Sequence, residues 1–238
     1  MRGCLFTLLL GVVAIALLVT IGLPQVYAGV LTGALTAAGL HADDTAVHVN
    51  SDPPTDLLGL HADAVSVSAT DATFRGMRIG RLELHLGDVA IVDRTARRVD
   101  GTLSDVSLTL SGGAAISIAE ITLGGGGDAI RASTVIDGTE VRSLIAQAVE
   151  QRTGVRPTSV TLKAPDTLAV DVGVTVTGTF DVDAAGDLVV RLVDDPAGIG
   201  ELVLLRGSTD LPIRLTDVRV TRAGDLRLSG DLSISILG

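Results

Sequence analysis

The sequence TLAVDVGVTVTGTFDVD, residues 167–183, carries an apolar residue or a glycine at every even position from Leu168 to Val182. Such alternation is typical of a strand with one buried face, because successive side chains of a strand point to opposite sides. We interpret the stretch as one strand of about 15 residues, bent at Gly173 and Gly178 and roughly 50 Å long. The alternative is a strand interrupted near Gly173. A flat sheet of such strands would expose a large apolar face, so we expect the sheet to curl around helices, itself or a ligand.

Two short loops have the composition of hairpin turns. In a hairpin with a three-residue loop, apolar residues at even positions before the loop continue at even positions after it. The last residue of such a loop takes a left-handed conformation and is usually glycine. Residues 184–186 and 222–224 both fit this loop, with Gly186 and Gly224 in the third position. We predict a hairpin at each place.

The remaining alternating segments predict further strands. Polar residues such as Glu83, His85 and Arg219 fill the positions between the apolar ones, which indicates an antiparallel sheet with one covered face. The apolar positions are Val65 and Val67; Leu82, Leu84 and Leu86; Val106, Leu108 and Leu110; Leu188, Val190 and Leu192; Val218 and Val220; Leu226 and Leu228; and Leu232, Ile234 and Ile236.

Two helices are expected among these strands, so the predicted fold class is α+β. The first follows Pro24 and ends at Gly39, with apolar residues at three- and four-residue spacing. The second begins at Asp137, which with Glu140 has capping-box spacing, and ends at Gly154. Its apolar stripe is Val141, Leu144, Ile145, Ala148 and Val149.

Composition restricts the partners of the chain. Its 238 residues carry a formal charge of −10, and Lys163 is the single lysine among 18 basic residues. Affinity for nucleic acid depends on clustered Lys and Arg, so we expect no nucleic-acid partner. Aromatic residues make up only 2% of the chain, so the predicted core consists of small branched side chains. We expect one domain over residues 25–238.

The N-terminal segment, residues 1–24, predicts export. Arg2 precedes an uncharged apolar run over residues 5–23, which approaches the ~30 Å of a hydrocarbon core. We interpret the run as a signal anchor, and the alternative is a signal peptide cleaved near Ala28. By the positive-inside rule Arg2 stays in the cytoplasm, so the rest of the chain lies in the cell envelope, outside the cytoplasmic membrane.

The sequence carries none of the common catalytic or metal-binding motifs. It has no G-x-S-x-G, H-E-x-x-H or C-x-x-C sequence, and its four histidines share no metal-ligand spacing, so we predict neither catalysis, a metal site nor a cofactor. We interpret Asp43, Asp44, Asp52 and Asp56 as residues of a solvated loop around the turn signal Pro53-Pro54, and Gly124–Asp128 as a flexible turn. Arg94, Arg97 and Arg98 cluster at a predicted turn and are weak candidates for binding a phosphate headgroup.

Three segments together resemble the LmeA-like phospholipid-binding proteins, a family common in actinobacteria. Residues 57–91 resemble the opening module of that family. Residues 130–154 look like its strand leading into a central helix, and residues 211–234 are similar to its closing hairpin. The resemblance runs from about Gly29 to the C-terminus and rests on hydrophobic pattern and turn placement.

The resemblance implies an exported phospholipid-binding protein of elongated, curled sheet and helices, similar to tubular lipid-binding domains. It implies a non-catalytic role in envelope lipid or lipoglycan maintenance, with the membrane contacted through the N-terminal segment. We expect a lipid between sheet and helix, lined by Val141, Leu144, Ile145, Val149, Leu168, Val170, Val172, Val174 and Val176. The alternatives are a structural or adhesive envelope protein with a solid core and, third, an envelope hydrolase.

Overall fold

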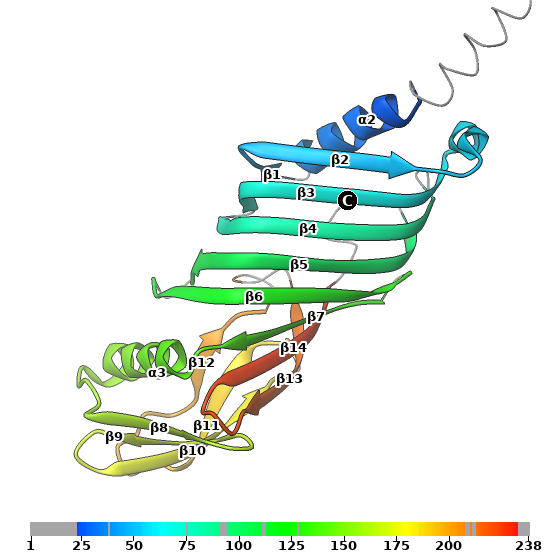
Figure 1. Ribbon diagram of the computed structural model, residues 1–238. Coiled ribbons are helices and arrows are strands. Elements are labelled where there is room, and N and C mark those ends of the chain that lie inside the picture. Colours follow the sequence, from blue (N-terminus) through cyan, green and yellow to red (C-terminus); the bar gives the residue numbers. More distant parts are fainter. Residues whose placement is uncertain are drawn as a thin grey trace, which may run out of the picture.

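The computed structural model describes residues 23–37, 39–74, 76–90, 95–110, 113–127, 129–207, 210 and 213–232. These residues form two antiparallel sheets, two α-helices and a short 3-10 helix, η2 (Pro54–Gly59). Figure 1 shows a ladder of long strands that continues into a second group of shorter strands around helix α3. The predicted α+β class with a curled antiparallel sheet is therefore confirmed.

The first sheet has nine strands, several of them unusually long. Its order is β1-β3-β4-β5-β6-β7-β14-β13, and β2 also pairs with β3. The strands are β1 (Leu40–His41), β2 (Asp44–Asn50), β3 (His61–Phe74), β4 (Met77–Ala90), β5 (Thr95–Thr109), β6 (Ala115–Gly126), β7 (Ala129–Ile136), β13 (Arg214–Val220) and β14 (Leu226–Leu232). Because an average strand has only about 5–6 residues, strands of this length need a device that curves them around a core.

In four neighbouring strands the buried residues switch between odd and even sequence numbers, and the switch occurs at the same position along the strands in all four. On each strand the buried residues there are three positions apart instead of two, so two consecutive residues face outward. The pairs are Ala69 and Ala72 on β3, Ile79 and Leu82 on β4, Leu103 and Val106 on β5, and Ile118 and Ile121 on β6. Since all four strands change together, the apolar face stays continuous and the register between strands is unchanged.

The residues at this level form a row that we call the Asp71 row: Asp71, Gly80, Asp105 and Ala119. The register places them opposite one another on adjacent strands, but none of them forms a regular β-pair with its neighbour. Asp71 and Asp105 have φ of 48° and 53°, a left-handed conformation that Asp tolerates better than most residues. An aligned row of local irregularities bends a whole sheet instead of a single strand.

A second row, Asp63, Asp88 and Arg97, crosses β3, β4 and β5 near the start of β3. Asp88 has φ of 50°. The buried residues again change parity there, from Ala62 to Val65 on β3. Figure 1 shows the long strands curving at the end next to η2.

The second sheet wraps around helix α3 (Gly138–Thr153). Its order is β12-β11-β10-β9-β8, with β8 (Ser159–Lys163), β9 (Thr167–Asp171), β10 (Thr175–Val182), β11 (Leu188–Asp194) and β12 (Leu202–Leu205). Helix α3 contacts both edge strands, β8 and β12, and also β6 of the first sheet. It therefore lies across the concave face of one sheet and against the end of the other.

The prediction of one long strand over residues 168–182 is wrong. β9 and β10 form a hairpin with a turn at residues 172–174, in which Gly173 has φ of 94° and Asp171 pairs with Thr175. The interrupted-strand alternative holds instead. A three-residue loop preserves parity, so the alternation passes through this turn unchanged and resembles a continuous strand.

The two predicted hairpins are confirmed. Gly186 has φ of 86° and Gly224 has φ of 88°, and each donates its N–H to the carbonyl three residues earlier. The ladder resumes directly at both sides, with Val182 opposite Leu188 and Val220 opposite Leu226.

Both predicted helices are present. Helix α2 (Leu23–Ala37) is followed by Gly39, whose N–H bonds to the carbonyl of Thr36. Asp137 caps α3 by accepting the N–H of Thr139 at 2.7 Å, and Gly154 ends it with φ of 74°. The local signals therefore predicted both ends of α3 and the C-terminal end of α2.

Two loop predictions are correct only in part. Asp43 and Asp52 are exposed and lie outside helices and strands, but Asp44 begins strand β2 and pairs with Thr70 of β3, and Asp56 lies in η2.

In the second segment only Gly127 lies in a turn. Residues 124–126 are the end of β6, where the backbone of Gly126 lies directly against the carbonyl of Arg97. Asp128, the last residue of the predicted turn, lies outside the described residues.

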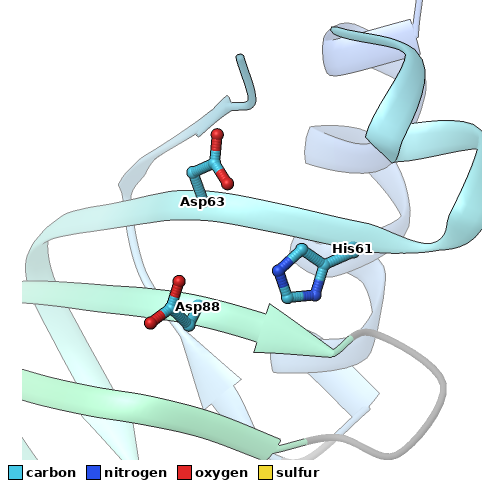
Figure 2. A group of neighbouring side chains, drawn as sticks. All are labelled: His61, Asp63 and Asp88. Carbon is cyan, nitrogen blue, oxygen red and sulfur yellow. The ribbon is translucent and has the colours of Figure 1, made fainter. Parts of the chain in front are cut away.

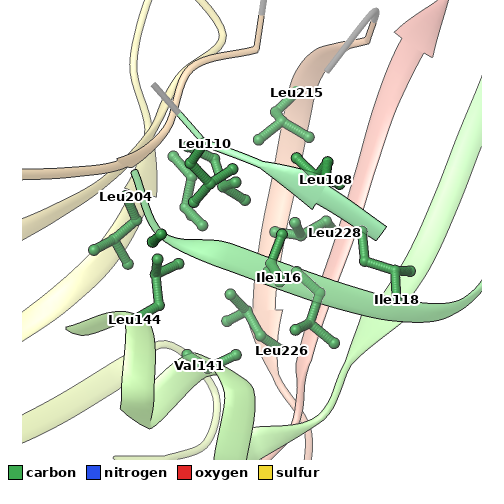
Figure 3. Close-up of a cluster of buried hydrophobic side chains, with 14 of the residues drawn as sticks. Leu108, Leu110, Ile116, Ile118, Val141, Leu144, Leu204, Leu215, Leu226 and Leu228 are labelled. Atoms are coloured by element: carbon green, nitrogen blue, oxygen red, sulfur yellow. The ribbon is translucent and has the colours of Figure 1, made fainter. Parts of the chain in front are cut away.

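The apolar face of the first sheet carries two clusters of buried side chains. One joins α2 and η2 to β2–β5 and contains Leu57, Val65, Val67 and Val89. The larger one joins the other end of the long strands to α3 and the second sheet. Figure 3 shows its centre, where Val141 and Leu144 of α3 meet side chains of β5, β6 and β14.

Candidate functional site

The structure brings most of the predicted lipid-lining residues together. Seven of the nine are buried in the larger cluster, Val172 packs partly buried against it, and Val174 is 47% exposed because it lies in the β9–β10 turn. The seven are Val141, Leu144, Ile145, Val149, Leu168, Val170 and Val176. That a lipid contacts these side chains stays a prediction.

A pocket opens at the edge of this cluster, between α3, β12 and the ends of β5 and β6. Its volume is about 200 Å³. The apolar part of the lining is Leu110, Ala114, Leu144, Ala148, Val203 and Leu204. Of the nine predicted lipid-lining residues only Leu144 reaches the pocket. The apolar run of β12 was the signal that could have identified the opposite wall.

The rest of the pocket lining is polar. Gln147, Gln151, Arg206 and Asp210 complete its lining. Asp210 accepts the backbone N–H of Arg206 at 2.8 Å, and the Asp210 N–H bonds to the Arg206 carbonyl at the same distance, which ties the segment after β12 into a closed turn. A lining that combines apolar and polar side chains suits an amphipathic ligand.

The loop between β11 and β12 is fixed by one carboxylate. Asp195 accepts the N–H of Gly200 at 2.7 Å and that of Ile199 at 2.9 Å. These two bonds favour the charged form and hold the pKa of Asp195 below its usual value. Ile199 is thereby held in the core, and its carbonyl accepts a bond from Arg152 near the end of α3 at 3.2 Å.

The arginines proposed for a headgroup lie elsewhere. Arg94 is outside the described residues. Arg97 and Arg98 are exposed and lie within strand β5, not in a turn as predicted. Their part in headgroup binding stays a prediction.

One group of described side chains has ligand types suited to a divalent cation. Ligand atoms of His61, Asp63 and Asp88 all lie within 4.8 Å of one another (Figure 2). Sequence reasoning missed the group because Asp88 joins it only through the pairing of β3 and β4. Asp63 accepts the backbone N–H of Asp52 at 2.6 Å, so it also has a structural part in the loop before η2.

The predicted anchor falls almost entirely outside the described residues. Residues 5–22 are not described, and Leu23 is the first residue of α2. In the part of the chain that the structure describes, neither α-helix combines the length and the apolar character that crossing a bilayer requires.

Comparison with known families agrees with the resemblance seen in the sequence. The model of a family described as LmeA-like phospholipid-binding matches residues 19–231. The chain belongs to this family. No curated protein and no solved structure gave a significant match.

Proposed function

We propose that this chain binds phospholipid in the cell envelope, outside the cytoplasmic membrane, in lipid or lipoglycan maintenance without catalysis. Residues 5–23 would hold it at the membrane, or cleavage near Ala28 would release it. Membership of a phospholipid-binding family supports the ligand class. The observation that carries the proposal is the pocket beside Leu144, which has both apolar and polar lining residues and is continuous with the buried cluster of α3.

The pocket is proposed as the entrance for an acyl chain. Each CH₂ group moved from water into apolar surroundings contributes about 0.8 kcal/mol, so even a few buried carbons give useful affinity. The transfer of a chain from a bilayer to an apolar pocket is nearly neutral by comparison, which permits both loading and release.

Full insertion of a lipid requires the pocket to widen. Its volume of about 200 Å³ is below the ~300–1,000 Å³ of ordinary ligand pockets. β12 is the element best suited to move, because it is a four-residue edge strand paired only with β11 in the described sheet. Val203 on this strand is already 44% exposed.

The membrane-facing end is proposed to be the end with η2. Large apolar side chains are exposed there, on α2 directly after the predicted anchor and on or next to η2, which α2 contacts. They are Val26, Val30, Leu58 and Leu60. Exposed apolar side chains next to a membrane anchor suit contact with the bilayer surface.

Native mass spectrometry of the full chain, extracted in a mild detergent, tests the proposal. We expect bound phospholipid on the wild type. Ala148→Phe places a large side chain in the pocket and should strongly reduce lipid occupancy. Ser143→Phe adds the same side chain to the exposed face of α3 and is the matched control. A wild type without lipid, or equal occupancy in Ala148→Phe, would contradict the proposal.

A structural protein with a solid core is the second candidate. Ile145, Val149 and Leu188 are 0% exposed, so this part of the core is filled by the protein's own side chains. This candidate predicts no lipid on the wild type and a loss of stability, without any change of ligand, in Ala148→Phe.

A further inference from the structure

Three cationic side chains from separate parts of the chain line one groove. The groove lies between the first turns of α3, the end of β8 and the β13–β14 turn, and its volume is about 640 Å³. Its cations are Arg142, Lys163 and Arg222. Lys163 and Arg222 are exposed and Arg142 is half-buried.

The groove is built by contacts among three turns. The N–H of Val220 bonds to the carbonyl of Pro165 at 2.6 Å, which joins β13 to the β8–β9 turn. Asp225 accepts the N–H of Gly138 at 3.1 Å, which joins the β13–β14 turn to the start of α3. A β-carbon on Gly138 would collide with the carbonyl of Gly224, so the close approach requires glycine. The cations are therefore held near one another by packed backbone.

Among the described residues no ion pair joins a carboxylate to Arg142, Lys163 or Arg222. The ion pairs that the structure shows there join other residues, such as Arg191 with Asp181 and Glu201. At the start of α3, Asp137 accepts the N–H of Thr139 and Asp225 accepts that of Gly138. The N–H of Thr139 lowers the pKa of Asp137, and the charge of Arg142 adds to this effect. Arg142 also donates a hydrogen bond to the Thr139 hydroxyl at 3.3 Å. On a chain of charge −10, three cations around one groove, none of them in an ion pair, favour an anionic ligand.

The rest of the lining indicates what carries the anion. Val160 and Leu162 of β8 contribute apolar surface and pack against the larger cluster. Arg binds phosphate oxygens through two parallel N–H groups, and Lys adds a point charge. The volume of the groove lies within the range of ordinary ligand sites.

We propose that this groove binds the phosphate of a phospholipid headgroup through Arg142, Lys163 and Arg222. The apolar side chains of Val160 and Leu162 contact the glycerol and the first carbons of the acyl chains. The inference rests on the proposed function for the identity of the ligand. It names a headgroup site that is separate from the pocket beside Leu144.

The test is titration of the full chain in a nonionic detergent with short-chain phosphatidylglycerol. Arg142→Gln, Lys163→Gln and Arg222→Gln should each weaken binding about threefold to tenfold, because each removes a charge-assisted contact. Arg78→Gln is the matched control, since Arg78 is an exposed arginine on β4 that does not line the groove. It should leave the affinity unchanged. Added salt should weaken binding to the wild type more than to the triple variant.

Two further ligands identify the source of the phosphate. Short-chain diacylglycerol should bind the wild type and the triple variant equally, because it lacks phosphate. Inorganic phosphate should bind much more weakly than phosphatidylglycerol; equal affinity would mean a free-anion site and would overturn the headgroup assignment. Unchanged phosphatidylglycerol affinity in all three variants would overturn it as well. Lys163 and Arg222 are exposed, so their variants keep the test valid even if Arg142→Gln does not fold. If these variants bind normally while Ala148→Phe loses its copurified lipid, the inference fails and the proposed function stands.

Discussion

Gly80 of β4 and Asp105 of β5 are direct cross-strand neighbours, and a β-carbon on Gly80 would lie 2.9 Å from the β-carbon of Asp105. Asp105 has a left-handed backbone and both residues belong to the Asp71 row, where the long strands change parity. The Asp71 row can therefore form only because Gly80 has no side chain. The row in turn keeps the apolar face of the curved sheet continuous.

Gly80→Ala should destabilise the protein by about 1–3 kcal/mol, because the added methyl group overpacks a site bounded by Asp105 and the backbone of Ser104. Urea unfolding of the full chain in detergent, followed by circular dichroism, measures the loss. Gly33→Ala is the control: a β-carbon there meets nothing within 4 Å, and alanine favours helix α2. Equal unfolding midpoints for wild type and Gly80→Ala would contradict the steric account of the row.

Cysteines at positions 169 and 177 should form a disulfide in a Cys4→Ser background. Ala169 and Thr177 are paired across the β9–β10 hairpin. Antiparallel partners have Cα atoms about 4.5–5.5 Å apart, within the separation of about 4.4–6.8 Å that a disulfide requires. In a continuous strand the two positions would be roughly 26 Å apart. Mass spectrometry after mild oxidation measures the cross-link.

The control for this cross-link pairs cysteines at positions 169 and 181. Position 181 is odd-numbered like position 177, so both side chains lie on the same face of β10. It lies four residues further along the strand, where Asp181 pairs with Val189. This pair should stay reduced. Cross-linking of the control, or none in the 169 and 177 pair, would argue against the hairpin.

Acid should loosen the β11–β12 loop through Asp195. Its pKa is lowered in the folded state by the N–H groups of Gly200 and Ile199, so the unfolded chain takes up the proton at higher pH. The stabilisation is present above the usual value of 3.8 and is lost as the pH falls through the lowered value. We expect the midpoint temperature of thermal unfolding to decrease as the pH falls below about 4.

Asp195→Asn should lower the midpoint at neutral pH and reduce its dependence on acid, because an amide offers one acceptor oxygen instead of a charged pair. Thermal unfolding of wild type and variant across the acid range measures both effects. Ser143→Ala, which removes an exposed hydroxyl and no carboxylate, should keep the wild-type acid dependence. An equally steep acid dependence in Asp195→Asn would rule out Asp195 as its source.

Leu57 and Leu58 provide a matched pair at η2. Leu57 is 0% exposed and its carbonyl accepts the hydroxyl of Tyr27 on α2 at 2.7 Å, whereas Leu58 is 63% exposed. Leu57→Ala should cost about 2–5 kcal/mol of unfolding free energy, and Leu58→Ala about 0.5 kcal/mol or less. Urea unfolding distinguishes them. Similar losses for both variants would mean that η2 does not pack as described.

Several features could be predicted because they depend on residues close in sequence. The caps of α3 at Asp137 and Gly154 and the hairpin loops ending in Gly186 and Gly224 each involve groups a few residues apart. The buried stripe of α3 follows from helical spacing alone. The switch of the long strands between odd and even buried positions is also visible in the sequence, as the three-residue spacing between Ile79 and Leu82, although the prediction of simple alternation does not include it.

Other features of the fold and the site could not be predicted from local sequence patterns. Alternation could not separate a bent strand from the turn at Gly173, because both keep apolar residues at even positions. The groove cations come from α3, β8 and the β13–β14 turn, and no spacing in the sequence relates them. The same holds for Asp88, which meets His61 and Asp63 only through strand pairing.

The order of residues alone determined where this chain buries one side of its strands and where its helices begin and end, because those preferences arise from neighbours along the backbone. Tertiary structure alone decided which strands pair, where the aligned rows bend the sheet, and which charged side chains share a groove. Those outcomes depend on contacts between segments tens of residues apart, and their energies are set only when the whole apolar face is packed.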